Sequence, residues 1–123
     1  MVLVGSPEKP NQVIGYHTLL FSQVRQDAIP NDRPRITRDI PVILLGQLGV
    51  DLSFQGRGIG DLLLTDAQAR VAVVAAKIGV RALMLNARNE KLAGWYEQHD
   101  FIRFPDSLRM FKSIDAVRQL HLL

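Results

Sequence analysis

The chain has 123 residues, of which 47% are hydrophobic, and it carries a formal net charge of +3. This length fits a single domain, residues 1–123, with enough apolar side chains for a core. No apolar run reaches the roughly 18 residues of a membrane-spanning helix, and the N-terminus lacks a signal-peptide pattern. The absence of cysteine excludes disulfides and thiolate chemistry and suits a cytoplasmic protein. The positive charge suits an anionic ligand, but it is equally typical of an ordinary basic protein.

The N-terminal half predicts two strands joined by a polar loop. Residues 5–11 contain two prolines and a glycine, which predicts an irregular start. Residues 13–21 are rich in β-forming side chains and predict a strand. Residues 25–41 contain three prolines and predict a long loop, either functional or mobile, with four arginines: Arg25, Arg33, Arg35 and Arg38. Residues 42–50 form a near-continuous apolar run, typical of a strand that is covered on both faces.

The C-terminal half alternates helices and strands. Apolar residues at three- and four-residue steps predict a long helix over 58–78, which Gly79 terminates. The other predicted elements are a buried strand, a second helix, two closing strands and a terminal helix, over residues 81–86, 90–99, 101–104, 108–114 and 115–122. The central strand–helix–strand unit favours a parallel pair with a right-handed crossover. We therefore predict an α/β (α+β) fold, with a mixed, mostly antiparallel sheet of five or six strands and helices on its faces.

A glycine-rich stretch, Gln55 to Gly60, joins the apolar strand to the long helix. The unpaired N–H groups of a helix N-terminus and the helix dipole form an anion site, which is best suited to phosphate. Glycines at 56, 58 and 60 let the backbone approach a ligand closely, and Arg57 adds a cation. The glycine spacing fits neither a P-loop nor a dinucleotide-binding fingerprint. On these residues alone, the stretch is either a phosphate site or a tight connection between strand and helix.

The same stretch resembles the Gln/Arg-x-x-Gly-x-Gly/Ala signature of the GNAT acetyltransferase superfamily. Residues 48–51 resemble the Leu-x-Val strand end of that family. Asn89 through Tyr96 to Phe101 resembles its Asn-x-x-Ala-x-x-x-Tyr-x-x-x-Gly-Phe segment. This resemblance covers about residues 12–114. Residues 40–48, 51–55 and 78–83 are further similar to the GNAT toxins of toxin–antitoxin pairs.

The chain departs from the family pattern at several positions. Asp100 stands where the family has glycine, and Leu92 and Gly49 stand where it has alanine. The family also has a first strand and two helices before the strand that begins near Val13, where this chain has about a dozen residues. The resemblance therefore implies a GNAT fold that lacks these elements, either as a truncated protein or as a reduced one with an exposed core.

The resemblance implies direct transfer of an acetyl group from acetyl-CoA to an amine, without a metal. The pantetheine arm would lie along the backbone of Leu48 and Val50, whose N–H groups would bond its amides and polarise the thioester carbonyl. The pyrophosphate would lie on the glycine-rich loop, and Asn89 would bind the ligand or fix the following turn. The implied contacts to acetyl-CoA come from Leu48, Gly49, Val50, Gln55, Gly56, Arg57, Gly58, Ile59, Gly60 and Asn89.

Tyr96 is implied as the general acid for the departing thiolate. The pKa of a free phenol is about 10 and that of a thiol about 8.5, so full proton transfer is uphill by roughly 2 kcal/mol. Tyr96 therefore needs a tuned pKa, or it stabilises the thiolate through a hydrogen bond. On residue pattern alone, a helical tyrosine that packs its ring in the core is the alternative. No general base is evident, since His17 and His99 fit core or surface positions.

The resemblance to toxins implies acetylation of the α-amino group of aminoacyl-tRNA, which blocks translation, and a ribbon–helix–helix antitoxin as partner. An α-amino group has a pKa of about 7.7–8.0 and needs little base catalysis. The arginines of residues 25–41 contact RNA phosphates in one interpretation and are solvated in the other. Two alternatives remain: an N-acetyltransferase for small molecules or proteins, and a non-catalytic module that binds CoA or a partner. Exposed apolar surface would also favour a homodimer.

Overall fold

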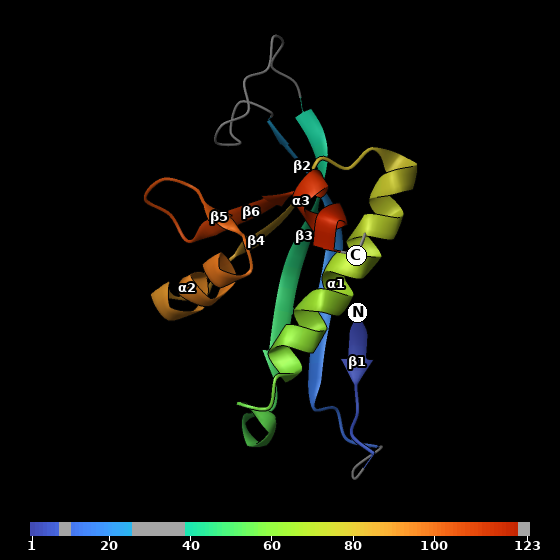
Figure 1. Ribbon diagram of the computed structural model, residues 1–123, viewed down its shortest axis with the longest axis vertical. Coiled ribbons are helices and arrows are strands. Elements are labelled where there is room, and N and C mark those ends of the chain that lie inside the picture. The colour runs from blue at the N-terminus through green and yellow to red at the C-terminus, as the bar shows by residue number, and fades with distance from the viewer. Residues whose placement is uncertain (8–10, 26–38, 121–123) are drawn as a thin grey trace.

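The computed structural model describes residues 1–7, 11–25 and 39–120, which form a sheet with the strand order β1-β2-β3-β4-β6-β5 and three α-helices (Figure 1). The strands are β1 (Val2–Val4), β2 (Gly15–Arg25), β3 (Asp39–Val50), β4 (Ala82–Asn86), β5 (Ile102–Arg103) and β6 (Arg109–Ser113). The helices are α1 (Ile59–Ile78), α2 (Glu90–Gln98) and α3 (Ile114–Leu120), and a short 3-10 helix, η2 (Leu52–Phe54), precedes α1. None of the described helices combines the length and the apolar character that crossing a bilayer requires.

The sheet is antiparallel except for one parallel pair, β3 with β4, which α1 connects. The predicted mixed, mostly antiparallel fold is therefore confirmed. The parallel pair is short, because its register runs only from Ile43 opposite Leu83 to Leu45 opposite Leu85. Strand β3 continues to Val50, so its last residues have no strand partner on the β4 side within the described chain. The two strands diverge there, at the end of the sheet where α1 begins.

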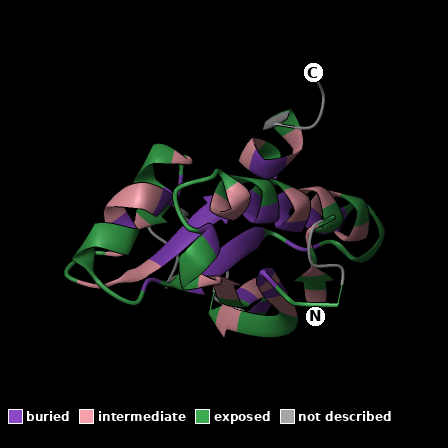
Figure 2. Cartoon of the chain, turned by 90° about the horizontal axis from the view of Figure 1, so that it is seen from below, coloured by how far each residue is buried: buried purple, intermediate pink, exposed green. Residues whose placement is uncertain are grey.

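Helix α1 covers one face of the sheet because one side of it is apolar. The buried side of α1 consists of Leu63, Leu64, Ala67, Val71 and Ala75. All of these except Leu63 belong to a core cluster that also contains residues of β3, β4, α2 and α3. Figure 2 shows the buried strands beneath the helices. Gly79 ends α1 as predicted, with φ of +68° and its N–H bonded to the Ala75 carbonyl at 3.2 Å. A smaller apolar cluster, on Ile40, Val42, Ala82, Met84 and Phe111, lies apart from this core.

The structure differs from the prediction around β1 and β2. Strand β1 was not predicted, because three residues are too few for a recognisable alternation; it pairs with the start of β2, Val2 opposite His17. Strand β2 continues to Arg25 and β3 begins at Asp39, so the loop predicted over 25–41 is wrong at both ends. Its other arginines, Arg33, Arg35 and Arg38, lie outside the described residues.

Candidate active site

A cavity of about 1280 Å³ lies where β3 and β4 diverge, next to the start of α1 and one side of α2. Its lining includes the last residues of β3, the glycine-rich loop and several side chains of α2. These are the three segments that carry the sequence motifs, so the fold brings them together in one place. The order of elements explains this, because the unit β3–α1–β4–α2 returns both helix N-termini to the same end of the sheet.

The wall formed by β3 contains Leu48, Gly49 and Val50. A Cβ atom built on Gly49 would lie 2.7 Å from Cε1 of Tyr16, on the neighbouring strand β2. The Tyr16 ring therefore occupies the space that a side chain at residue 49 would need. This contact explains why the chain has glycine where the family pattern has alanine, and it adds Tyr16 to the cavity wall.

The glycine-rich loop leaves the N-terminus of α1 open. Gly56 and Gly58 have φ of +77° and +78°, a left-handed conformation that glycine adopts without a steric penalty. Gly58 is the N-cap of α1, and no side chain caps the N–H groups of the first turn. Uncapped N–H groups at the positive end of a helix dipole bind anions. The loop therefore has the geometry of a phosphate site, with Gln55, Ile59 and Gly60 also on the cavity wall.

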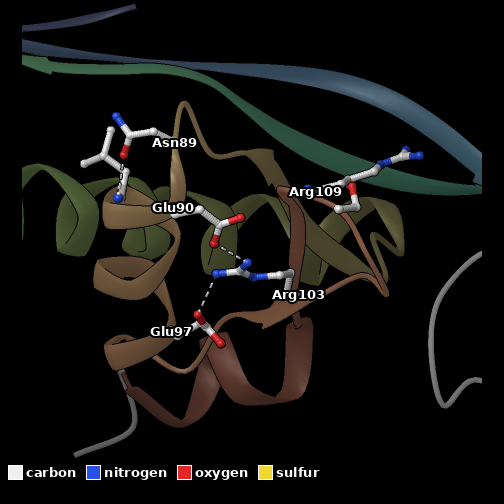
Figure 3. A network of polar contacts seen from close by, with 7 residues as sticks. Asn89, Glu90, Glu97, Arg103 and Arg109 are labelled. Carbon is white, nitrogen blue, oxygen red and sulfur yellow. Dashed lines mark hydrogen bonds and ion pairs between the residues drawn. The ribbon is translucent and has the colours of Figure 1, made fainter.

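Two side chains that were predicted to bind acetyl-CoA, Arg57 and Asn89, interact with neighbouring residues and do not line the main cavity. Arg57 packs over the Phe54 ring, 4.9 Å from its centroid, and lines a smaller cavity between β1 and α1. The Asn89 side chain caps α2, since its Oδ1 accepts a hydrogen bond from the Leu92 N–H at 2.9 Å. Figure 3 shows Asn89 at the start of this helix. Gln55 lines the main cavity and also braces the loop, because its amide donates to the Val50 carbonyl at 3.1 Å.

Tyr96 lines the cavity from α2 and is 8% exposed. Its ring contacts Trp95 and Phe101 edge to face, with centroid distances of 4.8 and 5.6 Å. Burial raises the pKa of Tyr96 above its usual value, and the positive charge of Arg88 opposes that rise. The phenol is therefore protonated at neutral pH. A protonated phenol at the edge of a cavity is able to donate a hydrogen bond or a proton to a ligand.

Several cavity residues were missed from the sequence. Arg88 follows β4 and Lys91 lies in the first turn of α2, both beside Asn89 in the predicted motif. Neither makes an ion pair with a described residue, so two cations remain free near Tyr96. Asp61 and Trp95 also line the wall. The sequence indicated these four residues only through their closeness to the two motifs, since each lies within a few residues of Gly60, Asn89 or Tyr96.

His17 and His99 were considered as general bases, and neither of them lines this cavity. His17 is buried between β2 and α1, and its Nε2 is 2.7 Å from Oδ2 of Asp66. This bond lowers the pKa of Asp66. His99 lies at the end of α2, with Nε2 3.0 Å from Oδ1 of Asp61. Both imidazoles therefore have carboxylate partners outside the cavity or at its margin.

The end of α2 explains another departure from the family pattern. Asp100 has φ of +69° and follows the C-cap residue His99. A left-handed residue after a helix is usually glycine, because a Cβ atom is strained in that conformation. Aspartate is among the side chains that tolerate it best. The replacement of glycine by Asp100 therefore preserves the turn that leads into Phe101, whose N–H bonds the Tyr96 carbonyl at 3.2 Å.

A family model described as an acetyltransferase (GNAT) domain matches residues 8–103. The chain therefore belongs to the GNAT acetyltransferase family, as the motifs predicted, and its fold is that of an N-acetyltransferase. A relative, the tRNA-acetylating toxin of Mycobacterium tuberculosis, is 36% identical over 114 residues, which cover 91% of this chain and 69% of that protein.

Solved structures of bacterial toxins match the fold. A tyrosine-to-phenylalanine mutant of KacT has a TM-score of 0.85 at 25% identity, covering 96% of this chain and 71% of that one. AtaT complexed with acetyl-methionyl-tRNAfMet has a TM-score of 0.79 at 29% identity, covering 94% and 70%. An AtaT mutant bound to the C-terminus of the antitoxin AtaR and acetyl-CoA has a TM-score of 0.76 at 27% identity, covering 91% and 67%.

Proposed function

We propose that this chain is an acetyl-CoA-dependent N-acetyltransferase of the toxin type, which acetylates the α-amino group of aminoacyl-tRNA and thereby blocks translation. The observation that carries the proposal is the convergence of three features on one cavity: the divergent end of β3, the open N-terminus of α1 and the phenol of Tyr96. Each feature suits a different part of the reaction. The relative that acetylates tRNA and the AtaT complex with acetyl-methionyl-tRNAfMet support the choice of acceptor.

Donor binding follows from the first two features. The pyrophosphate of acetyl-CoA binds the N–H groups of the first turn of α1, which Gly56 and Gly58 leave accessible. The pantetheine arm lies along Leu48 to Val50, where β3 remains paired with β2 but has no strand on its β4 side, so backbone groups on that side are available for amide hydrogen bonds. Acetyl-CoA bound to AtaT together with its antitoxin supports this donor.

The chemical step uses Tyr96. The acceptor amine attacks the thioester carbonyl, the tetrahedral intermediate collapses, and the carbon–sulfur bond breaks. Because its raised pKa makes full proton transfer to a thiolate unfavourable, the Tyr96 phenol stabilises the departing thiolate by donating a hydrogen bond. The amine loses its own proton to solvent, and the thiolate takes up a proton from solvent. Burial keeps the Tyr96 phenol protonated for this role, while the nearby positive charge of Arg88 lowers the cost of the negative charge that develops.

The acceptor and the partner follow from the relatives and from charge. The net charge of +3 favours RNA, whose phosphates bind cations in a salt-dependent manner. The antitoxin complex of AtaT supports an antitoxin partner for this chain. An aminoacyl-tRNA acceptor would require a cytoplasmic protein. Among the described residues of the cavity wall, Arg88 and Lys91 are cations without an ion pair, and we expect them to meet the acceptor.

The decisive test incubates the purified protein with acetyl-CoA labelled in its acetyl group and with charged or uncharged tRNA. We expect label only in charged tRNA, and mild alkaline release should yield N-acetyl amino acid. Spermidine and a short peptide serve as competing acceptors in parallel reactions. Labelling of either competitor, with charged tRNA left unmodified, would contradict the assignment of the acceptor but retain the acetyltransferase.

The pKa of Tyr96 sets the alkaline side of the pH profile. Because burial raises the pKa of Tyr96 above its usual value of 10.0, most of the phenol stays protonated up to about that pH. The acidic side follows the α-amino group, which loses its proton at about pH 7.7–8.0. We expect kcat/KM to rise through pH 8 and to stay level up to about pH 10. A fall between pH 8.5 and 9.5 that is absent from the Tyr96→Phe variant would contradict a raised pKa.

A further inference from the structure

Two hydrogen bonds from different parts of the chain meet at His99, the residue that caps α2. The His99 side chain bonds Asp61, in the first turn of α1, at 3.0 Å. Since a carboxylate only accepts, the imidazole Nε2–H is the donor. The His99 carbonyl accepts a second bond, from Nζ of Lys112 on β6, also at 3.0 Å. Residue 99 therefore ties the end of α2 both to α1 and to the sheet.

The first of these bonds reaches the glycine-rich loop. Asp61 lines the cavity directly after Gly60, so its carboxylate stands beside the open N-terminus of α1. The His99 ring also contacts Trp95, at 4.8 Å between centroids. The indole packs over the loop, because a Cβ atom built on Gly60 would lie 3.6 Å from Cζ2 of Trp95. Loop and helix thus meet through Asp61, Trp95 and His99.

The second bond anchors the same point in the core. Lys112 is 3% exposed, and its ammonium also bonds Oε1 of Gln68 on α1 at 2.7 Å. A cation at the C-terminus of a helix interacts favourably with the helix dipole. Burial lowers the pKa of Lys112. Both of its hydrogen-bond acceptors are uncharged oxygens, and together they hold the end of α2 against α1 and β6.

Tyr96 lies one turn before this point. Its carbonyl accepts hydrogen bonds from the His99 and Phe101 N–H groups, at 2.9 and 3.2 Å. The Trp95 ring, which His99 contacts, in turn packs edge to face on the Tyr96 ring. Helix α2 has only nine residues, so its position depends on such side-chain contacts more than on its own length. Any movement at residue 99 is therefore transmitted to the phenol.

We propose that His99 is a positioning residue for acetyl transfer, which couples the glycine-rich loop at the start of α1 to Tyr96 on α2. The inference rests on the function proposed above. In the proposed function the loop binds acetyl-CoA and Tyr96 stabilises the leaving thiolate, so the loop and Tyr96 must keep a fixed separation. A displacement of about 1 Å in a catalytic group costs up to about 100-fold in rate. The bond between His99 and Asp61 is the direct polar link between the two elements that the structure shows near the cavity.

The kinetic test compares His99→Leu with His99→Gln. His99→Leu removes the donor to Asp61, and we expect kcat to fall about tenfold while the Kd of acetyl-CoA changes less than about threefold. His99→Gln supplies an amide N–H for the same carboxylate, so it should recover at least about half of the lost activity. The Asp61→Ala, His99→Leu double variant should be no slower than the slower single variant, because both changes remove one interaction.

The matched control is Arg103→Ala. Arg103, on β5, bonds Glu90 at 2.6 Å and Glu97 at 3.0 Å, and thus holds α2 from a different set of side chains (Figure 3). Because these bonds involve neither the loop nor Trp95, we expect kcat to stay within about twofold of the parent even if thermal stability falls. Equal losses of kcat in Arg103→Ala and His99→Leu would overturn the proposal, since any loosening of α2 would then suffice.

Hydrogen–deuterium exchange with CoA alone separates this inference from the identity of the acceptor. In the parent, CoA should slow exchange both at residues 56–62 and in α2. In His99→Leu it should slow exchange at residues 56–62 only. Equal protection of α2 in both proteins would overturn the coupling. Absence of protection at residues 56–62 in the parent would instead refute the proposed donor site, and with it the basis of the coupling.

Discussion

The Tyr96→Phe variant is expected to lower kcat by about 10²- to 10³-fold while the Kd of acetyl-CoA stays within about threefold of the parent. The change removes only the hydroxyl, so the edge-to-face contacts of the ring with Trp95 and Phe101 remain. In the proposed mechanism the loss falls on kcat, because the hydroxyl would act when the carbon–sulfur bond breaks, whereas donor binding would depend on the loop and β3. Turnover is measured at saturating acetyl-CoA, and affinity by calorimetry.

The chain supplies a matched control for this variant. Its other tyrosine, Tyr16, lines the same cavity from β2 and packs over Gly49. Tyr16→Phe removes a hydroxyl from the same cavity, and we expect kcat within about threefold of the parent, because no role in bond cleavage depends on it. Similar losses in both variants would indicate a general effect of cavity polarity. Full activity of Tyr96→Phe would remove Tyr96 from the mechanism.

The second large effect is expected from Gly58→Val, which should weaken acetyl-CoA binding at least about tenfold. Gly58 has φ of +78°, a conformation that costs a side-chain-bearing residue about 1–2 kcal/mol and is most strained for a β-branched one. Relief of this strain would turn the loop and redirect the N–H groups that we propose to bind the phosphate. Calorimetry with acetyl-CoA, together with thermal unfolding of the free protein, measures both effects.

Gly79→Val separates backbone strain from ligand binding. Gly79 has a similar φ, +68°, at the other end of α1, and open space surrounds it as it does Gly58. Both variants should therefore lose a similar amount of stability, about 1–2 kcal/mol, whereas only Gly58→Val should lose affinity. If Gly79→Val weakened acetyl-CoA binding equally, the effect would come from general destabilisation, and the loop would not be the phosphate site.

Local sequence was sufficient for most of the fold. The long helix was predicted because Leu63, Ala67 and Val71 repeat with helical spacing, and its end because Gly79 is suited to a left-handed cap. Strand β1 was missed because its pairing with His17 and its neighbours is a tertiary contact without a local pattern. The limits of the loop over 25–41 were wrong because prolines and arginines predict irregular chain. Pro41 nevertheless lies within β3, where its carbonyl accepts a hydrogen bond from the Arg81 N–H.

The site was predictable to the level of segments. The order strand, glycine-rich loop, helix, strand, helix brings Gly58 and Tyr96 to one end of the sheet, and the family motifs identified both. Side-chain direction was not predictable. Arg57 turns to the Phe54 ring, and no spacing rule distinguishes that contact from one with a phosphate. The link between His99 and Asp61 joins residues 38 apart, which only the folded structure brings together.

The short pairing between β3 and β4 has a consequence for the free protein. Three residue pairs, from Ile43 to Leu45, join two half-sheets, β1–β3 and β4–β6, with α1 lying across them. Acetyl-CoA whose amides bond the β4 side of the end of β3 would add hydrogen bonds where the β3–β4 pairing stops. The substrate would then also stabilise the fold. By mass action, a ligand at about 100 times its Kd adds about 2.7 kcal/mol to the free energy of unfolding. The cellular concentration of acetyl-CoA would then set both the rate of acetyl transfer and the fraction of this protein that is folded.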